Sequence, residues 1–108
     1  MSIKYNEYLL LELFNSEPLI IDREAEIYKY QIKGEMGFEL TLYFSVYDQY
    51  ATVRLGCKEL KKPIFEVDME NVVEIRAGKE KISFFKQESQ EPVFQVRISP
   101  SFMLDISL

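Results

Sequence analysis

The feature that most constrains this fold is an alternation of apolar and polar residues, which begins near Tyr28 and continues to the end of the chain. Successive side chains of an extended strand point to opposite faces, so a period of two buries one row and leaves the other in water. The alternation recurs in eight segments, near residues 28–32, 38–46, 51–57, 65–69, 73–75, 82–84, 94–98 and 102–106. Short strands in succession predict an antiparallel meander.

Turn-forming residues fall between these rows. Glycine tolerates a positive φ and proline presets φ, so both are typical of tight connections. The residues of this kind are Gly34, Gly37, Gly78, Pro92 and Pro100. Because no gap is long enough for a second unit, we expect one domain over residues 1–108.

The first part of the chain has a helical period instead. Over about residues 4–15, apolar side chains recur three and four positions apart, as in Tyr5, Leu9 and Leu13, which predicts one amphipathic helix. Pro18 follows closely and ends it. A strand over residues 8–13 is the competing interpretation, because a short apolar run also suits a buried strand.

The predicted fold class is therefore α+β and mainly β. We expect an antiparallel meander of about eight strands, arranged as a curved sheet, a half-barrel or a sandwich, with one N-terminal helix. With 108 residues, of which 47% are hydrophobic, the chain is long enough to bury a core without a metal or a disulfide.

The parity of the apolar rows restricts how neighbouring strands pair. The even-numbered row of 38–46 meets the odd-numbered row of 51–57 only across an even loop, and Asp48-Gln49 is predicted as a two-residue turn. This register places Tyr47 opposite Tyr50 and Tyr43 opposite Arg54, all on the face away from the core.

Two further connections follow from parity. The rows of 65–69 and 73–75 are both odd, so either a tight hairpin has the odd loop 70–72 or the chain bends there with a bulge. In the last pair Ile98 is predicted to meet Phe102 across residues 99–101.

The charge of the chain favours basic partners. Thirteen Lys and Arg against 18 Asp and Glu give a net charge of −5, which argues against nucleic acid as a direct ligand. We expect Lys58, Lys61 and Lys62 to lie in a solvated loop. The aliphatic run 9–11 lies between Glu7 and Glu12, so we expect neither a signal peptide nor a membrane span, and a cytoplasmic location.

The residue inventory points away from catalysis. The chain has no His, and its single Cys, Cys57, falls on an inward-facing row, where a thiol acts as a small hydrophobe. Two carboxylate rows lack the spacing of a calcium loop. They consist of Asp22, Glu24 and Glu26, and of Glu66, Asp68 and Glu70. We therefore predict no catalytic residue, no metal and no cofactor.

The outward face of the second and third predicted strands is the candidate site. Tyr43, Tyr47, Tyr50 and Arg54 are neighbours there, and Tyr and Arg are the residue types that dominate protein interfaces. Glu66 and Asp68 add negative potential, and these six residues form the predicted partner-binding set. Alternatively the tyrosines stabilise an exposed sheet, or the helix covers them. Tyr28 and Tyr30 lie on apolar rows, where we expect them to pack.

The order of these segments resembles the small β-rich immunity proteins of bacterial polymorphic toxin systems. The segments are LFNSEPLIID (13–22), FELTL (38–42), IFEVDMENVVEI (64–75), FQVRI (94–98) and FMLDI (102–106). The His that such proteins often carry before the first strand is missing. The resemblance implies a non-enzymatic protein that binds a cognate toxin domain tightly and blocks its active site or another essential surface. An acidic inhibitor suits a basic toxin such as a nuclease.

Two alternatives belong to other functional classes. In the first, a curved sheet encloses an apolar cavity for a small ligand, lined by Phe38, Leu40, Phe84 and Phe94. In the second, the chain is a structural module that buries a sheet edge or the tyrosine face in a homodimer.

Overall fold

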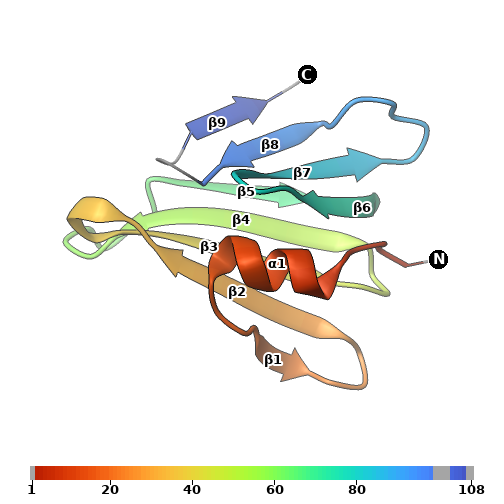
Figure 1. Ribbon diagram of the computed structural model, residues 1–108, viewed down its shortest axis with the longest axis horizontal. Coiled ribbons are helices and arrows are strands. Elements are labelled where there is room, and N and C mark those ends of the chain that lie inside the picture. The colour runs from red at the N-terminus through yellow and green to blue at the C-terminus, as the bar shows by residue number, and fades with distance from the viewer. Residues whose placement is uncertain (1, 99–102, 107–108) are drawn as a thin grey trace.

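The computed structural model describes residues 2–98 and 103–106, in which one helix precedes two antiparallel sheets (Figure 1). The helix is α1 (Glu7–Phe14). The strands are β1 (Leu19–Asp22), β2 (Ile27–Lys33), β3 (Phe38–Ser45), β4 (Tyr50–Cys57), β5 (Phe65–Met69), β6 (Val72–Ala77), β7 (Lys81–Lys86), β8 (Phe94–Arg97) and β9 (Met103–Ile106). Strands β1 to β5 form the large sheet and β6 to β9 the small sheet, each in sequence order. The predicted fold class is confirmed.

Strand β1 is the element that the alternation does not predict. Leu19, Ile20 and Ile21 are all exposed, because β1 is the edge of the large sheet and pairs only with the start of β2. Because these three apolar residues are consecutive, they do not show the alternation of apolar and polar residues that predicts the other strands. The described residues therefore contain nine strands where about eight were expected.

Helix α1 is shorter than the predicted span of residues 4–15. The side-chain oxygen of Asn6 accepts hydrogen bonds from the backbone N–H groups of Tyr8 and Leu9, at 3.0 and 3.1 Å, and so caps the helix. Before the cap the chain is extended, and Lys4 forms a parallel bridge with Glu74 of β6. Asn15, with a φ of 55°, ends the helix. The alternative of a strand over residues 8–13 is wrong.

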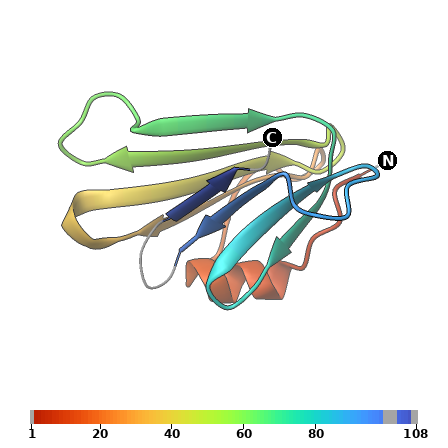
Figure 2. The same ribbon diagram turned by 90° about the horizontal axis from the view of Figure 1, so that it is seen from above.

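One core joins α1 to both sheets. The inner residues of β3 and β4, the apolar row of the small sheet and the buried side of α1 belong to the same cluster of buried side chains. Its largest fully buried members are Phe14, Phe44, Phe84, Leu10, Leu40, Leu42, Ile75 and Ile82. Figure 2 shows α1 and the ends of β6 and β7 on one side of the molecule, with β3, β4 and β5 on the other side. The sheets are not closed into a barrel, and the sandwich is the predicted arrangement that the structure has.

The chain passes from one sheet to the other at residues 70–71. Strand β5 pairs with β4 and β6 pairs with β7, so the tight hairpin between residues 65–69 and 73–75 is wrong and the predicted bend is correct. Asn71, with a φ of 59°, makes the bend. The pairing of β6 shifts between Val72 and Glu74, so Val72 is fully buried and Val73, which we expected in the core row, is half-buried.

The β3–β4 register differs from the prediction by two residues. Ser45 pairs with Tyr50, Tyr43 with Thr52 and Thr41 with Arg54, and the connection is the four-residue link 46–49. The predicted pairs of Tyr47 with Tyr50 and Tyr43 with Arg54 are therefore wrong. A shift of two preserves parity, so every side chain within β3 and β4 keeps its predicted face, whereas Tyr47 lies outside both strands.

The cause is a backbone contact outside the hairpin. The N–H of Val46 donates to the carbonyl oxygen of Glu26 at 3.0 Å, and the carbonyl oxygen of Val46 accepts from the N–H of Ile3 at 2.9 Å. Val46 is thereby removed from the β3–β4 ladder. The β8–β9 hairpin has Arg97 paired with Met103; the predicted pair of Ile98 with Phe102 lies outside the described residues.

Candidate partner-binding face

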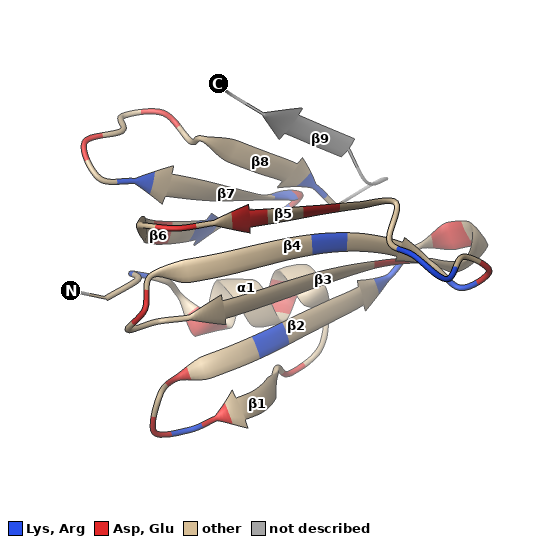
Figure 3. Ribbon diagram, turned by 180° about the vertical axis from the view of Figure 1, so that it is seen from behind, with Lys and Arg blue, Asp and Glu red and all other residues tan. Residues whose placement is uncertain are grey.

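The outer face of the large sheet, turned away from the core, carries most of the predicted site. Cross-strand neighbours form two rows there. One row is Lys29, Tyr43, Thr52 and Asp68, and the other is Gln31, Thr41, Arg54 and Glu66. In Figure 3 this face is toward the viewer and α1 lies behind the strands. The helix therefore does not cover Tyr43 or Tyr50.

Polar contacts between β4 and β5 organise the middle of the face. Arg54 Nη2 lies 3.3 Å from Glu66 Oε1, and both side chains are substantially exposed. Thr52 Oγ1 donates to Asp68 Oδ1 at 2.8 Å and also lies 3.0 Å from the hydroxyl of Tyr50. Because an exposed ion pair contributes only about 0–1 kcal/mol to stability, these groups are available to a partner at little cost to the fold.

A hollow of about 450 Å³ lies at one end of the outer face. It is lined by Ile27, Tyr43, Ser45, Asp48, Tyr50, Glu70 and Asn71. Ser45 is buried and its hydroxyl donates to Asp48 Oδ2 at 3.1 Å, which fixes one carboxylate at the rim. The second carboxylate, Glu70, is exposed and comes from the link between the two sheets.

Tyr47 lies apart from the other predicted tyrosines. It is 56% exposed, belongs to the link 46–49 and does not line the hollow. The carboxylate of Glu26 accepts a hydrogen bond from the Tyr47 hydroxyl, and this bond, with the charge of Glu26, raises the pKa of the phenol. The same carboxylate accepts from the Tyr28 hydroxyl at 3.3 Å. The structure thus brings five of the six predicted residues onto one face and places Tyr47 at its end.

Tyr28 and Tyr30 pack on the inner face, as predicted. The ring of Phe44 lies 5.7 Å from that of Tyr28 and 6.1 Å from that of Tyr30, and Phe14 of α1 lies 5.4 Å from Tyr30. Burial is the main cause that raises the pKa of Tyr30 to about 12. These rings belong to the core and not to a binding surface.

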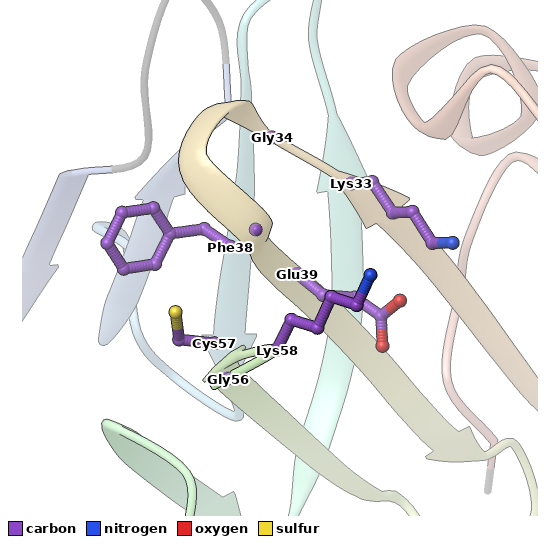
Figure 4. A pocket seen from close by; sticks show the side chains of 8 residues that line it. Lys33, Gly34, Phe38, Glu39, Gly56, Cys57 and Lys58 are labelled. Carbon is purple, nitrogen blue, oxygen red and sulfur yellow. The ribbon is translucent and has the colours of Figure 1, made fainter. Parts of the chain in front are cut away.

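The residues proposed for an apolar ligand cavity do not share one. Leu40, Phe84 and Phe94 are fully or almost fully buried, and the rings of Phe84 and Phe94 lie 5.8 Å apart. Phe38 instead lines an open pocket of about 500 Å³, to which the other three do not contribute (Figure 4). The pocket also contains Cys57, which is half-buried at its edge.

The two carboxylate rows are dispersed. At the end of β1, Asp22 Oδ1 accepts from the N–H of Ala25 at 3.0 Å, whereas Glu26 in the following link contacts the tyrosine hydroxyls described above. Within residues 2–98 and 103–106, no three potential ligands of the His, Cys, Asp or Glu type are gathered closely enough to hold a metal ion.

The predicted partner-binding set lacks five residues that line the hollow: Ile27, Ser45, Asp48, Glu70 and Asn71. The parity of the rows predicts Asp48 in a tight turn, and Glu70 and Asn71 in either a hairpin loop or a bend, of which the bend is correct. Alternate connections of a meander lie at the same end of the strands. Carboxylates that recur in alternate connections are therefore the sequence signal that could indicate an acidic site at that end.

Comparison with known proteins gives a likeness at the level of the fold. No protein-family model matches the chain, and no curated protein matches it. A chain of the contact-dependent growth inhibition toxin–immunity protein complex from Klebsiella pneumoniae 342 superposes with a TM-score of 0.75 and 21% sequence identity. The match covers 99% of this chain and 98% of that chain. In the described part of the molecule, no helix could span a membrane, and α1 has only eight residues.

Proposed function

We propose that this protein is an immunity protein, which binds a cognate bacterial toxin domain and neutralises it without catalysis. The observation that carries the proposal is the likeness to a chain of a toxin–immunity complex over almost the whole length of both chains. The order of strands had suggested the same class from the sequence.

Of the two roles in such a complex, the inhibitory role suits this chain better. A toxin that cleaves its target needs nucleophiles, acids or bases, yet this chain has no His and its single thiol is half-buried. Its net charge of −5 also favours the neutralisation of a basic toxin, because complementary potentials accelerate association.

The outer face of the large sheet is the surface that we propose for the toxin. It presents Tyr43, Tyr50 and Arg54, the residue types that most often dominate binding energy, with Glu66 and Asp68 beside them. Tyr47 lies at the end of this face and extends it toward Glu26. The toxin would cover the face as a rigid surface, since β2, β3 and β4 beneath it are each paired on both sides.

The direct test uses the toxin domain encoded beside the gene of this protein. Isothermal titration calorimetry should give a one-to-one complex with a Kd in the nanomolar range or below, and the toxin should lose its activity at equimolar protein. Full toxin activity at a tenfold excess of this protein would contradict the proposal.

Self-association through a sheet edge is the second candidate, and one observation favours it. Leu19 of the edge strand β1 is 61% exposed, and Ile20 and Ile21 next to it are exposed as well. An apolar open edge is a template for pairing with another strand. Light scattering at 10 and 500 µM distinguishes a dimer from a monomer, and a monomer at both concentrations would eliminate this candidate.

A further inference from the structure

The two ends of the molecule differ sharply in charge. At one end lie four connections, residues 23–26, 46–49, 70–71 and 87–93, which we call the acidic end. Backbone hydrogen bonds tie them together: the N–H of Val46 donates to Glu26 O, and the N–H of Val72 donates to Gln49 O at 2.9 Å. The pairing of Val72 with Lys86 brings the fourth connection to the same end.

The acidic end holds six carboxylates and one cation. The carboxylates are Glu24, Glu26, Asp48, Glu70, Glu88 and Glu91, and the cation is Arg23. The opposite end, in its described connections 15–18, 34–37, 58–64 and 78–80, has four carboxylates and four lysines. Figure 3 shows red segments in each connection of the acidic end, whereas red and blue segments are mixed at the opposite end. The negative potential of the protein is therefore concentrated at one end.

The hollow opens where the acidic end meets the outer face. Two phenol rings, Tyr43 and Tyr50, and two rim carboxylates, Asp48 and Glu70, line it. Among the described residues neither of these carboxylates has an ion-pair partner, whereas Glu66 on the same face is paired with Arg54. The lysine nearest in the pairing, Lys29, is the cross-strand neighbour of Tyr43 and does not line the hollow. The hollow thus combines aromatic walls with uncompensated negative charge.

This combination is complementary to a guanidinium group. A planar cation gains from the faces of tyrosine rings and donates hydrogen bonds to carboxylates in a forked geometry. An ammonium group has the charge but neither the plane nor the fork.

We propose that the hollow is the anchor for an arginine side chain of the basic protein partner, and that the acidic end orients this partner on the outer face. The inference rests on the proposed function for the identity of the partner, but the affinity of the hollow for a guanidinium is independent of it. Asp48 and Glu70 would contact the cation, and Tyr43 and Tyr50 would stack against it.

The first test needs no toxin. The peptide Ac-Gly-Arg-Gly-NH2 is titrated into the ¹⁵N-labelled protein and followed by two-dimensional NMR, with Ac-Gly-Glu-Gly-NH2 as the control. We expect saturable shifts at the amides of residues 48, 50, 70 and 71 with the arginine peptide alone. In Asp48→Asn/Glu70→Gln these shifts should fall at least fivefold. Equal shifts with both peptides, or shifts outside the hollow only, would overturn the proposal.

A matched variant separates the hollow from general charge. Glu88→Gln/Glu91→Gln removes the same two charges from the same acidic end, from a connection that does not line the hollow. We expect Asp48→Asn/Glu70→Gln to weaken the affinity for the cognate toxin at least tenfold at 150 mM salt, and the matched variant to weaken it less than threefold. Equal losses in both variants would show long-range attraction without an anchor. If the wild-type protein does not bind the toxin, the proposed function fails, and the peptide titration still decides whether the hollow takes a guanidinium.

Discussion

The two faces of the large sheet use the same kind of residue for different purposes. On the inner face Tyr28 and Tyr30 pack with Phe44 beneath α1, whereas on the outer face Tyr43 and Tyr50 line an open hollow. Tyr43 and Phe44 are adjacent in the chain and lie on opposite faces. The comparison teaches that position in the alternation, and not residue type, decides whether an aromatic ring stabilises the fold or is available for binding.

The largest effect should separate these two neighbours. Phe44→Ala opens a cavity in the core and should reduce the free energy of unfolding by about 3–5 kcal/mol. Tyr43→Ala should reduce it by less than about 1 kcal/mol, because the ring is half-exposed. Urea denaturation measures both values. Comparable losses in the two variants would show that the faces do not differ as described.

High pH should also act on the inner face. The pKa of Tyr30 is raised to about 12 by burial and by the charge of Glu7, against about 10 in the unfolded chain. Because the folded pKa is the higher one, the stabilisation is complete below pH 10 and is lost as the pH rises from about 10 to about 12.

Thermal unfolding between pH 9 and pH 12 measures this loss. Tyr30→Phe should show a smaller fall in Tm over that range than the wild type, and the remaining fall should reflect Tyr5, whose pKa burial also raises. Tyr43→Phe, which removes a hydroxyl from the outer face, is the matched control. Identical profiles for Tyr30→Phe and the wild type would contradict the assignment.

The N-terminal cap of α1, the helix that covers the inner face, should have an intermediate effect on the free energy of unfolding. Asn6→Ala removes the acceptor for two backbone N–H groups and should cost about 1 kcal/mol. Asn6→Asp keeps an acceptor and should be close to neutral. Chemical denaturation distinguishes the two variants, and equal stability of Asn6→Ala and the wild type would argue against this start of the helix.

The smallest effect should come from the outer ion pair. A double-mutant cycle of Arg54→Ala and Glu66→Ala should give a coupling of about 0–1 kcal/mol to stability, because both side chains are exposed. A coupling above about 2 kcal/mol would place this pair with the structural residues of the inner face.

The alternation was sufficient to predict the buried face of β2, β3, β4 and β5, but not how the strands connect. Parity is a local property, so the predicted faces of β3 and β4 are correct although the predicted register is wrong by two residues. The error arose because Val46 bonds to Glu26 and Ile3, which are distant in sequence. The change of sheet at Asn71 likewise depends on where Met69 and Val72 pack, and neither is visible in a period of two.

The candidate site likewise has one part that could be predicted from the sequence and one part that could not. Tyr43, Tyr50, Arg54, Glu66 and Asp68 could be assigned to one face from the sequence, because they lie on outward rows. The hollow could not be predicted, because it joins residues of β2, β3 and β4 to the link between the sheets. Only the three-dimensional crossing brings Glu70 beside Asp48.

The central claim is that the outer face of the large sheet is the binding surface. The affinity of outer-face variants for the cognate toxin tests this claim most directly. The comparison is between Tyr43→Ala/Arg54→Ala and Tyr8→Ala, since Tyr8 is 71% exposed on α1, on the opposite side of the sheet. We predict a loss of at least one hundredfold in affinity for the outer-face variant, with a Tm within a few degrees of the wild type, and a loss below threefold for Tyr8→Ala. Undiminished binding by the outer-face variant, or a larger loss in Tyr8→Ala, would contradict the account.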